Sequence, residues 1–438
     1  MAARRREVRL MSGEALDLGP NAASVLAEGR RAEEARVQVA EALSVLVRCV
    51  VLTIGDQRLA DWDLLPAVEG GDLQAVVVPH PLEELRGAEA GLKTPAELEL
   101  HACLDFSGLD LEVLSDAIGE FSGLQELYCE DNRLSALPES ITRLKRLQVL
   151  HLETNSLAEL PADFGRLRHL QELCLRSNSI ALLPRSFPRL RHLQHLDLSS
   201  NSLVVLPRGF GWLSSLQHLN LRRNHLHQLP VDFGLLANLR ELDLSKNAVT
   251  SFPGSFSRLS SLQDLLAAEN RLDGLPEDFG MLVSLRAIDL TENTLNWLPT
   301  SFGHLAALVK VKLSCNQLVF LPDSICHLSS LEKLSVDSNL VLTLPENFGR
   351  LTSLTALYLD GNHLEALPKS FGDLANLREL DLSGNQLQAL PESFTAKRLG
   401  ALWEWGLDGN PLHRLTPVQR EAVLQWNPDV RLPPARAA

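Results

Sequence analysis

Residues 354–376, LTALYLDGNHLEALPKSFGDLAN, decide the fold of this chain. In the first half, Leu357 and Leu359 recur at the period-two spacing of a short strand that buries one face. Asn362 follows this strand, and its side-chain amide can satisfy backbone groups of a neighbouring copy in a buried turn. The first half therefore predicts a short strand that ends in a hydrogen-bonded turn.

The second half of the stretch turns the chain back. Pro368 favours an extended exit from the turn, because proline has no backbone N–H that would need an acceptor. Ser370 occupies the position expected for a helix N-cap, and Phe371 and Leu374 follow at helical spacing. We therefore expect one capped helical turn after each strand.

The pattern repeats with a period of 23 residues. Each asparagine is followed six residues later by proline and nine residues later by Phe or Ile. One copy cannot bury its leucines alone, whereas stacked copies bury them continuously, so the period predicts a solenoid. The repeated asparagines are Asn132, Asn155, Asn178, Asn201, Asn224, Asn247, Asn270, Asn293, Asn316, Asn339, Asn362 and Asn385.

Over residues 124–415, the motif L-P-x-x-F-G-x-L-x-x-L resembles the intracellular 23-residue subtype of the leucine-rich repeat superfamily. Within that superfamily the chain resembles the Ras-group repeat proteins, including the plant intracellular members, and the repeat halves of Scribble- and Erbin-type scaffolds. The resemblance implies the fold more strongly than the function, because the repeated residues are structural.

We predict an α/β solenoid, a leucine-rich repeat horseshoe with a parallel β-sheet on the concave face, short helical turns on the convex face and helical caps at both ends. The predicted segments are a disordered tail (1–20), an N-terminal helical segment with degenerate capping repeats (21–94), the solenoid (95–415), and a C-terminal capping helix and tail (416–438).

The N-terminal segment departs from the repeat. Residues 22–46 place apolar side chains on one face of an amphipathic helix, and residues 46–52 and 73–78 carry strand patterns without the asparagine. The run ELELHAC then places Cys103 in the asparagine position of an irregular first repeat, which would cover the open end of the solenoid.

The C-terminal end carries a different cap. Leu402, Trp405, Leu407 and Asn410 fall in the repeat positions two residues late. Thr416 and Pro417 are an N-cap and first helical residue. The helix that follows is expected to turn Val418, Ala422, Leu424 and Trp426 toward the last repeat, and Trp403, Trp405 and Trp426 are interpreted as packing in the cap.

Composition indicates a cytoplasmic protein that does not bind nucleic acid and does not span a membrane. The net charge of -14 and the pI near 5.4 oppose general binding to phosphate backbones or anionic lipid. No apolar run is long enough for a membrane span, and the basic N-terminus lacks the apolar region of a secretory signal. The six cysteines are scattered rather than clustered, which favours free thiols.

No catalytic motif is present, so we expect no enzyme activity, no cofactor and no metal site. One concave-face ladder leaves an alternative open, because Glu172, His195, His218 and Glu241 occupy one strand position in consecutive repeats. Two imidazoles between two carboxylates could hold a divalent metal. The other interpretation, which we favour, is a solvated ladder of charged and polar groups paired across strands.

Partner binding is expected on the concave face, where residue types vary from repeat to repeat. The two tyrosines, Tyr128 and Tyr358, share one outward position, and Lys310, Lys312 and Lys333 come from the two strands before Tyr358. Tyrosine gives a large contact area at low entropic cost, and lysines suit an acidic partner.

A second candidate surface is apolar. Leu266 and Ala268, with Ala287 on the next strand, would form a small apolar stretch in the middle of the array. Single exposed apolar residues are normal, so this stretch is a hypothesis alongside the site around Tyr358.

These patterns predict a cytosolic protein–protein interaction scaffold or adaptor in intracellular signalling that binds partners on its concave face. The Ras-group resemblance implies small GTPases or their effectors as partners. The alternatives are a ligand-sensing fragment of an immune-type receptor and a structural subunit of a larger complex.

Overall fold

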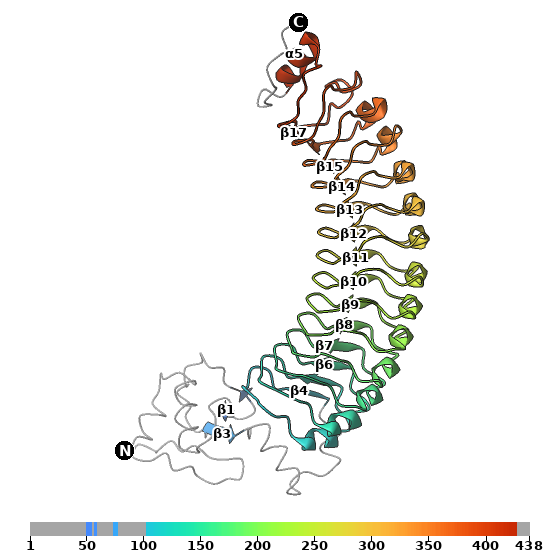
Figure 1. Cartoon of the computed structure of the whole chain (residues 1–438). Helices are drawn as coiled ribbons and strands as arrows, with labels where there is room; N and C mark the ends of the chain where they lie inside the picture. Colours follow the sequence, from blue (N-terminus) through green and yellow to red (C-terminus); the bar gives the residue numbers. More distant parts are fainter. Residues whose placement is uncertain (1–49, 55–56, 59–72, 78–101, 427–438) are drawn as a thin grey trace, which may run out of the picture.

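The computed structural model describes residues 50–54, 57–58, 73–77 and 102–426. From residue 102 onward the chain forms a curved solenoid, with strands along the inner side of the arc and short helical turns along the outer side (Figure 1). The predicted horseshoe with a concave parallel sheet is therefore confirmed. The predicted tail (1–20) and the predicted helix over 22–46 lie outside the described residues.

The concave sheet contains 14 parallel strands in sequence order. Its strands are β4 (Cys103–Asp105), β5 (Glu126–Tyr128), β6 (Val149–His151), β7 (Glu172–Cys174), β8 (His195–Asp197), β9 (His218–Asn220), β10 (Glu241–Asp243), β11 (Asp264–Leu266), β12 (Ala287–Asp289), β13 (Lys310–Lys312), β14 (Lys333–Ser335), β15 (Ala356–Tyr358), β16 (Glu379–Asp381) and β17 (Glu404–Gly406).

The convex turns are 3-10 helices, and one α-helix follows the last repeat. They are η3 (Asp116–Glu120), η4 (Glu139–Arg143), η5 (Phe164–Arg166), η6 (Phe187–Arg189), η7 (Phe210–Trp212), η8 (Phe233–Leu235), η9 (Phe256–Arg258), η10 (Phe279–Met281), η11 (Thr300–His304), η12 (Asp323–His327), η13 (Phe348–Arg350), η14 (Lys369–Asp373) and α5 (Pro417–Trp426).

The repeated asparagine joins neighbouring repeats, as predicted. Asn224 donates from Nδ2 to the carbonyl of Leu198 in the preceding repeat at 2.9 Å and to that of Leu221 in its own repeat at 3.0 Å. Its Oδ1 accepts from the backbone N–H of Leu203 at 3.0 Å. A buried turn without these bonds would leave backbone groups unpaired, which explains the invariant position.

The residue before each asparagine adopts a left-handed conformation that the sequence analysis missed. Its φ angle is 54° at Ser338 and 63° at Gly361, and the other repeats show similar values. Only two of the twelve regular repeats place glycine there, at Gly361 and Gly384, so the turn imposes this conformation on ordinary residues as well.

The phenylalanine column is buried inside the convex wall. Phe164 and Phe187 stack with ring centroids 6.2 Å apart, and the stacking continues ring by ring to Phe302. Ile325 replaces phenylalanine in the next repeat, and stacking resumes between Phe348 and Phe371. The predicted column is confirmed, with one interruption.

The predicted N-cap role of Ser370 is wrong. The η14 turn begins two residues after Leu367, Pro368 is its N-cap residue, and no side chain caps it. Ser370 lies inside the turn, where its hydroxyl accepts from the N–H of Gly349 in the preceding repeat at 3.0 Å and donates to the carbonyl of Glu346. Ser370 therefore links neighbouring repeats instead of capping its own turn.

Strands form at the N-terminal positions expected from sequence, but they do not resemble repeats. β1 (Val50–Ile54) pairs antiparallel with β2 (Gln57–Arg58) and β3 (Leu73–Val77) in a separate three-stranded sheet. These segments lack the asparagine whose bonds tie a strand to the parallel sheet. The interpretation as degenerate capping repeats does not describe these strands.

The first repeat has a different register from the one predicted. Cys103 begins β4 and lies opposite Glu126, so it occupies the first strand position rather than the asparagine position. Leu109 lies in the asparagine position, and its N–H donates to Asn132 of the next repeat at 3.1 Å. The repeat before Asn132 is therefore regular in spacing, although its own asparagine is missing.

The C-terminal cap forms as predicted in its main features. Asn410 donates to the carbonyl of Leu382 at 2.8 Å despite the two-residue delay. Thr416 caps α5, because its Oγ1 accepts from the N–H of Gln419 at 3.2 Å.

The side chains that pack this cap differ in part from the expectation. Trp405 and Trp426 contact each other with ring centroids 4.8 Å apart, as predicted. Trp403 is 67% exposed and does not pack in the cap. Val423 is buried, whereas Leu424, which we assigned to the buried face of α5, is exposed.

Candidate functional site

The inner side of the solenoid offers two outward positions on each strand. In β14, Lys333 and Ser335 face outward while Leu334 between them is buried. The fold fixes the buried position and leaves the two outward positions free to vary. We call Lys310, Lys312, Lys333 and Tyr358 the lysine–tyrosine surface.

Strand register brings two of these lysines side by side. Lys310 lies directly opposite Lys333 across β13 and β14, and both are exposed. Neither makes an ion pair within the part of the chain that the structure describes. Lys312 differs, because its Nζ lies 3.0 Å from the Asp289 carboxylate on β12. The sequence suggested three equivalent lysines. In the structure, Lys310 and Lys333 lie opposite each other without ion pairs, whereas the charge of Lys312 is neutralised by Asp289.

Tyr358 lies at the border between these lysines and a group of carboxylates. Its neighbours in register are Ser335 on one side and Asp381 on the other, and its hydroxyl donates to Glu379. This hydrogen bond, then burial and the charges of Glu379, Glu404 and Asp381, raise the pKa of Tyr358 from 10.0 to about 12. The phenol is therefore a neutral donor at physiological pH, and its ring is half-buried.

Tyr128 occupies the equivalent position far along the array, so the two tyrosines form separate sites. Its hydroxyl donates to Glu126 at 3.2 Å, and its ring meets that of His151 edge to face with centroids 5.1 Å apart. Burial and the neighbouring Glu126 raise the pKa of Tyr128.

His195 and His218 stack on each other, with ring centroids 4.6 Å apart and planes 7° from parallel. His218 Nδ1 lies 2.9 Å from Glu241, whereas the carboxylate of Glu172 lies against His151 instead. The four-residue ladder is thus divided into cross-strand pairs, as expected for a solvated ladder.

Leu266 is an isolated apolar residue rather than part of a continuous stretch. Its side chain is 38% exposed, and its register neighbours are Asp243 and Asp289. Ala287 lies opposite Asp264 and Lys310. Polar neighbours therefore break up the predicted apolar stretch.

An apolar groove that the sequence did not predict lies on the path between the strands and the convex turns. The groove has a volume of about 760 Å³ and draws its residues from four consecutive repeats. Trp297 and Phe320 are partly exposed in its wall at 36% and 52%. Both lie four residues after a repeated asparagine, where the other repeats carry small, polar or aliphatic residues, so the position itself was a usable signal.

No helix in the described residues is both long and apolar enough to cross a membrane. Family models described as "Leucine-rich repeat region" and "Leucine rich repeat" match residues 150–223 and residues 221–272, 307–364 and 331–387, respectively. No catalytic family is indicated. A search of curated proteins gives no match.

Comparison with solved structures also supports this fold. A leucine-rich repeat protein of Leptospira interrogans is 34% identical, with a TM-score of 0.65, and the match covers 74% of this chain and 81% of that one. The chain belongs to the leucine-rich repeat family. Another similar structure is that of the plant peptide hormone receptor RGFR1 in complex with RGF2. It is 27% identical, with a TM-score of 0.60, and the match covers 73% of this chain and 56% of that one.

A third match shows the fold alone. The internalin InlF of Listeria monocytogenes is 20% identical, with a TM-score of 0.60, and the match covers 74% of this chain and 93% of that one. Bacterial proteins and a receptor thus share this architecture, which supports a protein-interaction module without choosing between the groups.

Proposed function

We propose that this chain is a protein-interaction scaffold that binds a protein partner at the lysine–tyrosine surface. The observation that carries the proposal is the exposed, adjacent pair Lys310 and Lys333, next to the half-buried ring of Tyr358. Like charges directly opposite each other cost stability in a sheet. Their presence is more readily explained by an acidic partner than by folding.

An acidic partner would gain charge complementarity from the lysines and a large contact from Tyr358. The surrounding protein carries a net charge of -14, so an acidic partner is repelled elsewhere and steered to this surface. The tyrosine would supply a binding hot spot, while the lysines would mainly set the association rate.

We further propose a cytosolic role in intracellular signalling, with small GTPases or their effectors as partners. The resemblance to Ras-group repeat proteins supports this choice. The cysteines within the described residues, Cys103, Cys129, Cys174, Cys315 and Cys326, are free, which also supports a reducing compartment.

The test compares partners captured from native cytosol by wild type and by the double variant Lys310→Glu/Lys333→Glu. Cross-linking followed by mass spectrometry identifies each partner, and titration calorimetry with the purified partner measures affinity. We expect the double variant and Tyr358→Ala to lose binding, the latter by about 2 kcal/mol or more if it is a hot spot. Purified small GTPases in both nucleotide states then test the partner class.

Arg350→Glu is the control, because Arg350 is exposed on the convex η13 turn and its replacement reverses a positive charge away from the concave face. Binding that survives both concave changes and is lost with Arg350→Glu would show that the interface is on the convex wall.

A second candidate function is ligand sensing in a receptor, which the apolar groove favours. Trp297 and Phe320 could bury side chains of an extended peptide, since aromatic residues dominate such contacts. The similar RGFR1 structure contains a bound partner, RGF2. Phe320→Ala should abolish partner binding under this hypothesis, while Lys310→Glu/Lys333→Glu should leave it intact.

A further inference from the structure

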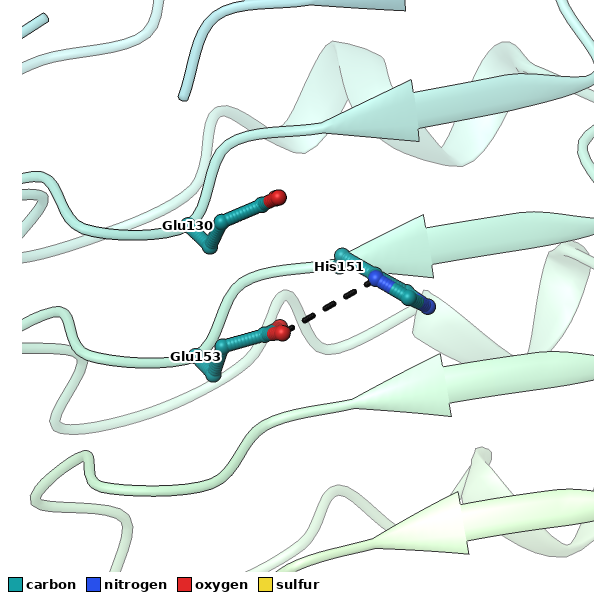
Figure 2. A group of neighbouring side chains, drawn as sticks. All are labelled: Glu130, His151 and Glu153. Atoms are coloured by element: carbon teal, nitrogen blue, oxygen red, sulfur yellow. Dashed lines mark ion pairs between the residues drawn. The ribbon is translucent and has the colours of Figure 1, made fainter. Parts of the chain in front are cut away.

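A cluster of three ligand-type side chains lies beside β5 and β6, far along the array from the lysine–tyrosine surface. Glu130 and Glu153 occupy the same turn position in adjacent repeats, two residues before Asn132 and Asn155. His151 is the last residue of β6. One oxygen of each glutamate and one ring nitrogen of the histidine all lie within 4.8 Å of one another. Figure 2 shows both glutamate side chains extending in the same direction, on the side where the His151 ring lies.

The His151 ring is oriented by a fourth residue. Its Nε2 lies 3.1 Å from Glu172 on β7, and its Nδ1 lies 3.8 Å from Oε1 of Glu153. In the tautomer with the ring proton on Nε2, His151 donates to Glu172, and the lone pair of Nδ1 lies on the side of Glu153. Histidines that bind metals commonly donate their other ring N–H to such an outer carboxylate.

The ring of Tyr128, on the preceding strand β5, restricts the His151 ring from the other side. It meets His151 edge to face at an interplanar angle of 83°. The imidazole is therefore held on two sides before any ligand arrives, which lowers the cost of ordering it.

Two carboxylate oxygens in the cluster lack partners. Oε2 of Glu130 and Oε2 of Glu153 are both shielded from solvent and accept no hydrogen bond within the described residues. No lysine or arginine of the described part forms an ion pair with either glutamate. An unpaired, desolvated carboxylate oxygen is costly, and two of them beside one imidazole would be stabilised together by a cation.

We propose that Glu130, His151 and Glu153 bind a divalent transition-metal ion of the zinc type. One imidazole nitrogen and two carboxylate oxygens suit Zn²⁺ or Mn²⁺, whereas Ca²⁺ and Mg²⁺ prefer sites made of oxygen alone. Bonds of about 2.0–2.2 Å require the ligand atoms to draw together by about 1 Å, which the flexible glutamate side chains permit. This proposal replaces the expectation from sequence that the chain has no metal site.

Three protein ligands leave a fourth position of a tetrahedral ion for water or for a side chain of a binding partner. The site would thus be open on one side.

The experiment titrates zinc chloride into metal-free wild-type protein and follows binding by calorimetry and the melting temperature. We expect one equivalent of zinc to bind and to raise the melting temperature. His151→Ala and Glu153→Gln should weaken binding by at least 10-fold, and Glu172→Gln by about 10- to 100-fold through loss of ring orientation. Circular dichroism of each variant without metal establishes that it is folded.

His195→Ala and Glu241→Gln are matched controls from the neighbouring ladder, where the same residue types pair across strands. They should leave zinc binding unchanged. The proposal is overturned if wild type binds no zinc or manganese, if it binds only calcium or magnesium, if folded His151→Ala binds as well as wild type, or if the control substitutions remove binding instead.

Discussion

The ammonium group of Lys312 lies 3.0 Å from the carboxylate of Asp289 on the preceding strand, whereas Lys310 on the same strand faces Lys333 on the next. One strand therefore presents a neutralised lysine and an unbalanced one. Lys312 therefore contributes to the stability of the sheet, whereas Lys310 is retained although its charge lowers that stability. Stability measurements can detect this difference without knowledge of a partner.

Replacing Lys333 with glutamate should stabilise the protein at low salt. The change converts a like-charge pair with Lys310 into an opposite pair, worth about 0.2–1 kcal/mol in a sheet. Lys312→Glu should act in the opposite direction, because it places a carboxylate against Asp289. Urea unfolding at low and high salt measures both, and equal effects of the two variants would contradict the assignment.

Asn224→Ala should lower the free energy of unfolding by about 1–3 kcal/mol, because it leaves a buried backbone N–H without a partner. The Leu203 N–H loses its acceptor, and the Leu198 carbonyl keeps only the hydrogen bond from Asn201. Equilibrium urea unfolding gives the value. The neighbouring exposed residue supplies a control, since His225→Ala should change little; an unchanged midpoint for Asn224→Ala would remove the structural role of this position.

Gly234→Ala should also be destabilising, for a steric reason. A Cβ at Gly234 would lie 1.8 Å from the backbone oxygen of Ser255 in the next repeat, and such overpacking costs about 1–3 kcal/mol. Ser257 occupies the same position one repeat later, where a side chain is accommodated. Ser257→Ala should therefore cost less, about 0.5–1.5 kcal/mol for its hydrogen bond to Asp278. Thermal unfolding of both variants makes the comparison.

Tyr358 should titrate well above an ordinary tyrosine. Its pKa is raised from 10.0 to about 12, so the folded state retains a proton that the unfolded state has lost between these values. The associated stability is complete below pH 10 and is lost as the pH rises toward 12. Tyrosinate absorbance of Tyr128→Phe, which leaves one tyrosine, follows Tyr358 directly. An ordinary titration near pH 10 in the folded variant would refute the hydrogen bond to Glu379 as its cause.

All six cysteines should react with a thiol reagent under denaturing, non-reducing conditions, as expected for a reducing compartment. In the folded protein, exposed Cys103 and Cys315 should react before Cys129, whose burial raises its pKa. Peptide mapping of the labelled sites tests the order. A disulfide between distant repeats would contradict the cytosolic proposal.

The repeat could be predicted in detail because each of its positions has one physical task. Asn224 and Phe210 recur at a fixed spacing since the turn and the convex wall each require the same side chain in every copy. Prediction was weaker where a residue's role depends on the exact start of an element. The roles of Ser370 and Cys103 depended on where a turn or strand begins, and a shift of a few residues gave them different partners.

Contacts between repeats were harder to predict than positions within one. Residues at a single strand position, such as His195 and His218, are visible from the repeat spacing, and these two stack. The cluster of Glu130, His151 and Glu153 combines a strand position with a turn position from two repeats. Comparing the same position from repeat to repeat therefore does not reveal it. Only the stacked geometry brings these atoms together.

The interruption of the phenylalanine column at Ile325 has a mechanical consequence. Rings stack continuously from Phe164 to Phe302 and again from Phe348 to Phe394, but the two interfaces around Ile325 lack the aromatic contribution of about 0.5–1.5 kcal/mol per pair. In an array stabilised by nearest neighbours, such a position is a weak coupling within the run from Phe164 to Phe394. A pulling force applied along the array should therefore separate it first near Ile325, into a longer block and a shorter one that each unfold as a unit.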